Sequence, residues 1–146
     1  ISGLPAFLTR DPGLNSGMMI VQVASASLVS ENKVLSHPAS VDSIPTSADK
    51  EDHVSMGATA ARKSRQILNN LRHVLAMELL CASQAIDLLR PLRSSKPLEA
   101  VQELIRSVVP PIGDDRIFHH DILAINTLLA EGKILAAAEG VIRELQ

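Results

Sequence analysis

Residues 67–89 read ILNNLRHVLAMELLCASQAIDLL, and apolar side chains recur in this stretch every three or four positions. The positions that recur are Leu68, Leu71, Leu75, Leu79, Ala82, Ile86 and Leu89. This spacing places them on one face of an α-helix, because a helix turns once in about 3.6 residues. The pattern predicts a long amphipathic helix, around which we expect the rest of the chain to be arranged.

The predicted long helix covers residues 51–89. Asp49 is a suitable N-terminal cap, and Glu51 and Asp52 would meet the positive end of the helix dipole in the first turn. Pro91 is expected to end the helix. At a rise of roughly 1.5 Å per residue such a helix is over about 50 Å long, which exceeds what a domain of this size can cover. Other chains, or further parts of the same protein, are therefore expected to pack on it.

Four further segments are expected beside the long helix. Residues 1–17 contain scattered prolines and glycines and predict an irregular connector. Residues 18–34 are apolar on nearly every face, which predicts a helix that is buried all round, inside a bundle or an oligomer interface. Residues 35–50 form a polar loop, and residues 90–146 predict short helices at about 97–108, 120–131 and 134–145. The fold class is therefore expected to be all-α, a bundle built on long helices.

The composition excludes several classes of protein. The apolar fraction is 46%, the formal charge is −2, and the basic side chains form no cluster, so neither nucleic acid nor a membrane is an expected partner. Cys81 is the only cysteine, which excludes an internal disulfide and a zinc cluster and favours a reducing, cytoplasmic location. Because the chain starts at Ile1 and not at Met, we expect it to be a piece of a larger protein.

Chemistry is expected in the stretch 36–55, which places two prolines, four carboxylates and two histidines between apolar helical segments. Loops held between rigid elements commonly carry catalytic and binding groups. From spacing alone, Glu51 is best explained as a carboxylate at a helix N-terminus, and His53 as a structural histidine. His37 is held extended by the proline that follows it and could pack or bind.

The pair His119 and His120, followed by Asp121, raises the question of a metal site. Adjacent residues on a helix point in different directions, and zinc motifs space their ligands differently. Surface capping is therefore favoured over metal binding, and no metal ligand is predicted. The sequence also contains no nucleophile elbow, P-loop or dinucleotide-binding glycine motif.

Several short motifs along the chain occur in a fixed order. They are Gly3-Leu4-Pro5, Gly13-Leu14-Asn15-Ser16-Gly17, Ser30-Glu31-Asn32-Lys33, Ser36-His37-Pro38, Ser40-Val41-Asp42-Ser43, Thr46-Ser47-Ala48 and Glu51-Asp52-His53-Val54-Ser55-Met56-Gly57. In these motifs the chain resembles the C-terminal region of the aromatic amino acid ammonia-lyases, and most of all the histidine ammonia-lyases. The likeness is dense between residues 3 and 57 and looser beyond about Leu92.

The resemblance implies that residues 1–146 are the C-terminal helical segment of a homotetrameric lyase, which converts L-histidine to urocanate and ammonia in histidine catabolism. Lyases of this family use an electrophilic methylidene-imidazolone (MIO) group, made from an internal Ala-Ser-Gly, and no metal. Such an electrophile is needed because no side chain is a strong electrophile and the β-proton of an amino acid is a very weak acid. No Ala-Ser-Gly occurs in these 146 residues. The segment alone is therefore expected to be inactive.

One catalytic position carries over from the resemblance. Glu51 matches the glutamate that faces the substrate side chain in histidine-specific members, and a carboxylate can orient an imidazole N–H or accept its proton. Glu51 together with His53 argues for histidine as the substrate. Three residues depart from the common family pattern: Asp49 and Lys50 replace Asn-Gln, and Met18 replaces Phe. The Lys50 ammonium would favour the ionised form of the neighbouring Glu51.

Two alternatives remain open from the sequence. The chain could belong to a tyrosine or phenylalanine ammonia-lyase or an aminomutase of the same family, since residues that select the substrate lie outside it. It could also be a non-catalytic helical assembly module that keeps the scaffold without the chemistry. The absence of Ala-Ser-Gly from this segment is compatible with both.

Overall fold

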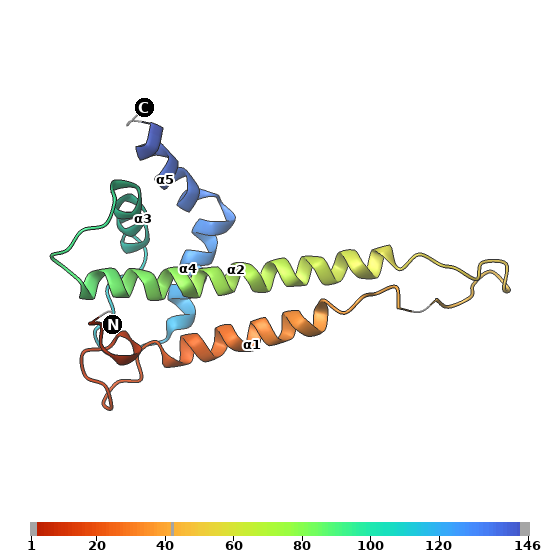
Figure 1. Ribbon diagram of the computed structural model, residues 1–146, viewed down its shortest axis with the longest axis horizontal. Coiled ribbons are helices and arrows are strands. Elements are labelled where there is room, and N and C mark those ends of the chain that lie inside the picture. The colour runs from red at the N-terminus through yellow and green to blue at the C-terminus, as the bar shows by residue number, and fades with distance from the viewer. Residues whose placement is uncertain (1–2, 42, 144–146) are drawn as a thin grey trace.

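The computed structural model describes residues 3–41 and 43–143, and this part of the chain is helical (Figure 1). A short 3₁₀ helix, η1, covers Ala6–Leu8. The α-helices are α1 (Met19–Leu35), α2 (Gly57–Leu88), α3 (Lys96–Arg106), α4 (Phe118–Ala130) and α5 (Lys133–Arg143). Within the described ranges no strand forms, which confirms the predicted all-α class.

Helices α1 and α2 form an antiparallel hairpin (Figure 1). The described chain between them, residues 36–41 and 43–56, continues beyond the ends of both helices as an extended arm. The Glu31 carboxylate on α1 ties the two helices together, because it accepts hydrogen bonds from Gln66 (3.1 Å) and Asn70 (3.0 Å) on α2. The hairpin therefore projects the arm away from the rest of the molecule.

The hydrophobic core lies around the C-terminal half of α2, where α4 crosses it (Figure 1). Leu80 on α2, Ile105 on α3 and Ile125 on α4 are each at most 1% exposed. Burying an aliphatic side chain of this size stabilises a fold by about 1.5–3 kcal/mol. Helix α5 packs on α3 and α4, so the C-terminal helices close around one end of the hairpin.

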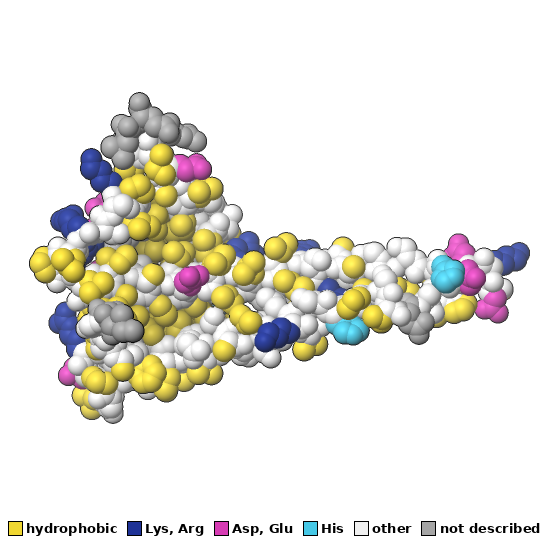
Figure 2. Space-filling view, viewed as in Figure 1, with side chains coloured by type: hydrophobic (Ala, Val, Ile, Leu, Met, Phe, Trp, Pro, Cys, Tyr) yellow, Lys and Arg dark blue, Asp and Glu magenta, His cyan; other side chains and the backbone are white. Residues whose placement is uncertain are grey.

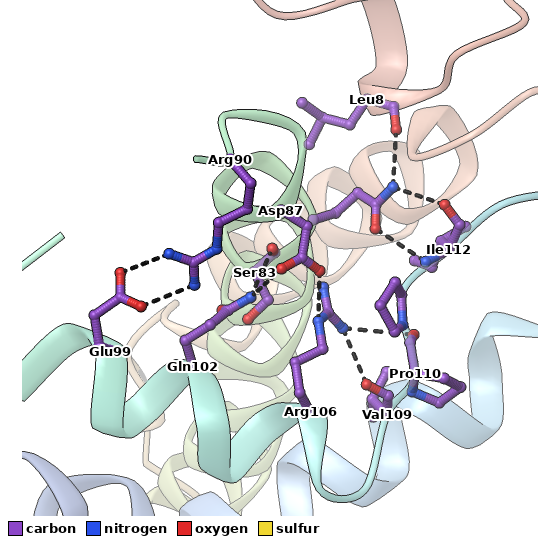
Figure 3. A network of polar contacts seen from close by, with 12 residues as sticks. Leu8, Ser83, Asp87, Arg90, Glu99, Gln102, Arg106, Val109, Pro110 and Ile112 are labelled. Atoms are coloured by element: carbon purple, nitrogen blue, oxygen red, sulfur yellow. Dashed lines mark hydrogen bonds and ion pairs between the residues drawn. The ribbon is translucent and has the colours of Figure 1, made fainter. Parts of the chain in front are cut away.

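Polar side chains from α2 hold the C-terminal helices in place (Figure 3). Asp87 accepts hydrogen bonds from Gln102 (2.8 Å) and from Arg106 (2.7 Å), the second of which is also an ion pair. Arg106 in turn donates to the carbonyl oxygens of Val109 (3.0 Å) and Pro110 (3.5 Å), which follow the end of α3. These contacts fix α3 against α2.

Gln84 on α2 joins three parts of the chain, and its partners Leu8 and Ile112 are labelled in Figure 3. Its Nε2 donates to the carbonyl oxygens of Leu8 (3.3 Å) and Ile112 (2.8 Å), and its Oε1 accepts the N–H of Ile112 (3.0 Å). The side chain is 3% exposed, so these bonds satisfy polar groups that water reaches poorly. Gln84 therefore anchors both the N-terminal segment and the α3–α4 connection to α2.

The prediction for the start of the long helix was wrong. Helix α2 begins at Gly57, so the loop predicted over residues 35–50 extends through Met56. Asp49 does not cap α2 but lies in the arm with a positive φ of 64°, and Glu51 and Asp52 lie outside the helix. The reason is local: the backbone of the arm closes a tight turn of its own, which excludes helical geometry there. The observed bounds of α1, α3 and α4 and the start of α5 lie within one or two residues of the predicted ranges, and the predicted end of the last helix at residue 145 lies outside the described residues.

The chain by itself leaves much of α1 uncovered, so the predicted burial of residues 18–34 inside a bundle or an oligomer interface stays a prediction. Val21 is the one buried residue within the described helix α1, while Val23 is 54% and Val34 is 73% exposed. The reason is that α2 is the main helix packed along α1, and it covers one side.

Figure 2 shows further hydrophobic side chains gathered over the end of the molecule where the C-terminal helices meet α2. In the part of the chain that the structure describes, no helix is both long enough and apolar enough to cross a membrane.

Candidate functional site: the turn at the end of the arm

The end of the arm is a turn closed by Thr46 and Glu51. The Thr46 N–H donates to the Glu51 carbonyl oxygen (2.9 Å), and the Glu51 N–H donates to the Thr46 carbonyl oxygen (3.3 Å). The side chains repeat the pairing, because Thr46 Oγ1 donates to Glu51 Oε2 at 2.9 Å. The catalytic candidate Glu51 is therefore held at its backbone and at its carboxylate by the same partner.

The backbone inside this turn is left-handed. Ser47, Ala48 and Asp49 have φ values of 56°, 54° and 64° in succession, and none of them is glycine. A left-handed conformation costs a residue with a Cβ roughly 1–2 kcal/mol. Such strain persists only where surrounding contacts enforce it, and it is concentrated at functional sites. The Thr46–Glu51 pairing provides contacts of this kind.

A second polar contact braces the arm just behind the turn. The Ser43 hydroxyl donates to the carbonyl oxygen of Asp52 (2.9 Å) and accepts the N–H of Val54 (2.9 Å). One small side chain thus joins the two sides of the arm. Beside it lies a hollow of about 540 Å³, whose lining residues include Ser43 and His53.

Glu51 and His53 are both exposed and lie on the same arm. His53 lines the hollow, whereas the side chain of Glu51 is not part of its wall. Thr46 occupies Glu51 Oε2, and the other carboxylate oxygen has no partner among the described residues. Figure 2 shows the acidic and histidine side chains gathered at the far end of the arm. The arrangement therefore presents a restrained carboxylate, with one oxygen able to accept a hydrogen bond from a ligand.

His37 lies at the base of the arm, away from this turn. Its carbonyl oxygen accepts a hydrogen bond from Lys63 Nζ on α2. The residue also lines a separate hollow of about 270 Å³ between the arm and α2. The structure therefore does not bring His37 together with Glu51.

The His119 and His120 pair lies on α4, at the other end of the molecule. Their rings meet edge to face, with centroids 5.8 Å apart. His119 lines a pocket of about 450 Å³ between α1, α2 and α4, together with His73. Within residues 3–41 and 43–143, no three His, Cys, Asp or Glu side chains are grouped so that they could hold a metal ion.

Met18, where the common family pattern has Phe, is 4% exposed and belongs to the hydrophobic core. Its N–H donates to the carbonyl oxygen of Phe7 (2.8 Å), which fixes the start of α1 against η1.

Cys81 is half-buried, and burial raises the pKa of its thiol above the usual 9.0. A raised pKa makes this cysteine a poor nucleophile near neutral pH.

Sequence reasoning missed Thr46 and Ser43 as partners of the candidate site. Both residues lie within motifs that carry the family resemblance, but threonine and serine are common in loops and carry no signal of their partners. Had a hairpin been predicted for the arm, Thr46 would have been expected opposite Glu51. The helix predicted from residue 51 excluded that pairing.

Comparison with known proteins gives a consistent family. The family model described as aromatic amino acid lyase matches residues 1–107. The histidine ammonia-lyase of Symbiobacterium thermophilum is 56% identical over 146 residues, which are 100% of this chain and 29% of that protein. The histidine ammonia-lyase of Caenorhabditis elegans is 56% identical over 137 residues, 94% of this chain and 20% of that protein.

Solved structures agree with the sequence relatives. The crystal structure of histidine ammonia-lyase from Trypanosoma cruzi has a TM-score of 0.90 and 52% identity, and the match covers 94% of this chain and 27% of that one. The tyrosine aminomutase from Streptomyces globisporus has a TM-score of 0.87 and 40% identity, covering 92% of this chain and 26% of that one. The chain thus spans less than a third of the length of these relatives.

Proposed function

The chain belongs to the aromatic amino acid lyase family, and from that premise we propose that it is the C-terminal part of a histidine ammonia-lyase. The proposed reaction eliminates ammonia from L-histidine and gives urocanate. Two comparisons favour histidine over another amino acid: the two sequence relatives named above are histidine ammonia-lyases at 56% identity, and the aminomutase structure is only 40% identical. The observation that carries the proposal is the Glu51 carboxylate, held in a restrained turn at the end of the arm.

In the proposed site Glu51 receives the imidazole of the substrate. A neutral imidazole has one N–H to donate, and an ionised carboxylate is an acceptor on both oxygens. Thr46 already occupies Oε2, so Oε1 is the oxygen that would accept the imidazole N–H. Through this contact the Glu51 carboxylate would orient the substrate ring, or accept the imidazole proton as charge develops during elimination. Phenylalanine offers no donor at the ring, so Glu51 would gain no bond from it.

The MIO group of the family would be formed by an Ala-Ser-Gly outside this segment. That tripeptide does not occur in the 146 residues, so the described residues do not form the group. When bound, the electrophile activates the substrate for loss of ammonia. The part proposed for this chain is to place Glu51 on the imidazole side of the substrate.

The remaining parts of the lyase and further subunits of a homotetramer are the proposed partners of this segment. Exposed apolar side chains support this, since Ile20, Val23 and Val34 on α1 are 54–73% exposed. The arm supports it as well, because it extends away from the helices that could enclose a substrate. A cytoplasmic location is proposed on the basis of the single, half-buried Cys81.

The test uses the complete protein and three amino acids. With L-histidine we expect the absorbance of urocanate to rise and ammonia to be released, while L-tyrosine and L-phenylalanine react far more slowly. Preferred turnover of tyrosine or phenylalanine would favour the alternative lyase or aminomutase. No turnover of any of the three would favour the non-catalytic assembly module.

Variants of Glu51 test the residue itself. Replacing the carboxylate by Glu51→Ala or Glu51→Gln is expected to lower kcat/KM for histidine by at least about tenfold, because the acceptor for the imidazole is lost or neutralised. Glu131→Gln is the matched control, since Glu131 is exposed at the end of α4 and pairs with Lys133. Near-normal kinetics of both Glu51 variants would remove Glu51 from the site.

A further inference from the structure

The carboxylate of Glu51 is held on one side by the hydroxyl of Thr46. We propose that Thr46 is a positioning residue for the ammonia-lyase reaction, which directs Glu51 Oε1 toward the imidazole by binding Oε2. This inference rests on the proposed function, because it takes Glu51 as the group that meets the substrate. It assigns to Thr46 no contact with the substrate and no proton transfer.

The hydroxyl is suited to this task by its stiffness. Threonine is branched at Cβ, so few χ1 rotamers are open to it and the direction of Oγ1 is restricted. The Thr46 backbone is in turn fixed to Glu51 by two hydrogen bonds of 2.9 and 3.3 Å. The hydroxyl therefore starts from a position that is already set relative to the backbone of Glu51.

Glu51 needs such a restraint because its side chain is flexible. A glutamate in an exposed loop samples many rotamers, and immobilising a rotamer-rich side chain costs about 0.5–1.5 kcal/mol when a ligand binds. The Thr46 bond imposes part of that order before the substrate arrives. A hydrogen bond to an ionised acceptor is also stronger than one between neutral groups.

The left-handed backbone between Thr46 and Glu51 also supports a positioning role for Thr46. Ser47, Ala48 and Asp49 would not adopt positive φ values without an enforcing contact. The Ser43 bonds to Asp52 and Val54 brace the arm from behind. The turn is thus closed by the Thr46–Glu51 pairing, and the Ser43 bonds hold the backbone that follows Glu51.

The experiment compares Thr46→Val with Thr46→Ser in the complete enzyme. Valine keeps the shape and the branching but removes the hydroxyl, whereas serine keeps the hydroxyl. We expect Thr46→Val to lower kcat for histidine by about tenfold with a smaller change in KM, because Glu51 would no longer be held in the position that stabilises the transition state. Thr46→Ser is expected to retain kcat within about threefold.

A double variant and a control complete the design. In the Glu51→Gln background, Thr46→Val is expected to have little further effect, because the two residues act as a unit. Thr127→Val is the matched control, since the Thr127 hydroxyl bonds within α4 to the Leu123 carbonyl oxygen (3.0 Å). Thermal melting of each variant reports whether the enzyme is intact.

The outcomes separate the two proposals. If Glu51→Gln is impaired but Thr46→Val is normal, Thr46 does not position Glu51, and the proposed function stands. If Thr46→Val and Thr46→Ser lose activity equally with a lower melting temperature, the role of Thr46 is structural and the inference is overturned. If Glu51→Ala and Glu51→Gln both have normal kinetics, the proposed role of Glu51 fails, and the inference fails with it.

Discussion

The N–H of Gly17 donates a hydrogen bond of 2.9 Å to Asp115 Oδ1, although the two residues lie 98 positions apart in the chain. The neighbouring N–H of Ser16 donates to the other carboxylate oxygen, Oδ2, at 2.7 Å. Asp115 precedes α4, and Gly17 precedes α1, so this carboxylate fastens the start of the hairpin to the C-terminal helices. Gly17 has a φ of 53°, and a Cβ there would lie 2.4 Å from the carbonyl oxygen of Phe7.

Gly17→Ala is therefore expected to destabilise the complete protein by about 2–4 kcal/mol, because the new methyl group clashes with backbone and the left-handed conformation is strained. Gly113→Ala is the matched control, because a Cβ at Gly113 meets nothing within 4 Å. Denaturant unfolding of both variants measures the difference. Equal free energies of unfolding for the two variants would show that the close approach at Gly17 is not maintained.

Gln84→Met is expected to lower the free energy of unfolding by about 2–4 kcal/mol. The reason is that the carbonyl oxygens of Leu8 and Ile112 and the N–H of Ile112 would lose hydrogen-bond partners that water cannot easily replace. Methionine keeps the approximate length of the side chain, so the change reports mainly on the hydrogen bonds. The control is Gln66→Met, since Gln66 is exposed and water can replace its bond to Glu31. A loss no larger than that of the control would mean that Gln84 is not an anchor.

Stability should depend on acid pH through Glu99. The hydrogen bond from Arg90 and the N–H of Ser94 lower the pKa of Glu99 below its usual 4.5. Because the folded-state pKa is the lower one, this contribution is complete above the unfolded value and is lost as the pH falls through the folded value. We expect Glu99→Gln to be less stable than the parent at neutral pH and equal to it in strong acid. Thermal melting across this range checks the convergence, and a gap independent of pH would contradict it.

The isolated segment, residues 1–146, is expected to give no urocanate from histidine. Its sequence lacks the Ala-Ser-Gly from which the family forms its electrophile, and Glu51 alone has no means of activating the substrate. The measurement is the absorbance of urocanate over hours with pure segment, beside the complete enzyme as a positive control. Turnover that survives repeated purification of the segment would refute this prediction.

The helices of this protein could be read from sequence because their signals are local. Leu71, Leu75 and Leu79 repeat at the period of a helix turn. Prolines and polar stretches between such patterns indicate where the helices end. The family could be inferred for a similar reason, since the ordered motifs between residues 3 and 57 do not depend on how the chain folds. Even so, the start of α2 was misplaced by six residues, from residue 51 to Gly57.

The spacing of apolar residues predicted the all-α class and the approximate helices, and the family resemblance carried by the ordered motifs made Glu51 the catalytic candidate. The folded chain was needed to show that Glu51 lies in a closed turn with Thr46, that Asp115 holds Gly17, and that Gln84 joins three segments. The physical reason is the range of the interactions. Helical periodicity arises between residues a few positions apart, whereas the bonds of Asp115 and Gln84 join groups that are distant in the sequence and meet only after the chain has folded. Thr46 and Glu51 are close in the sequence, but their bond depends on a left-handed turn that the residue types between them do not specify.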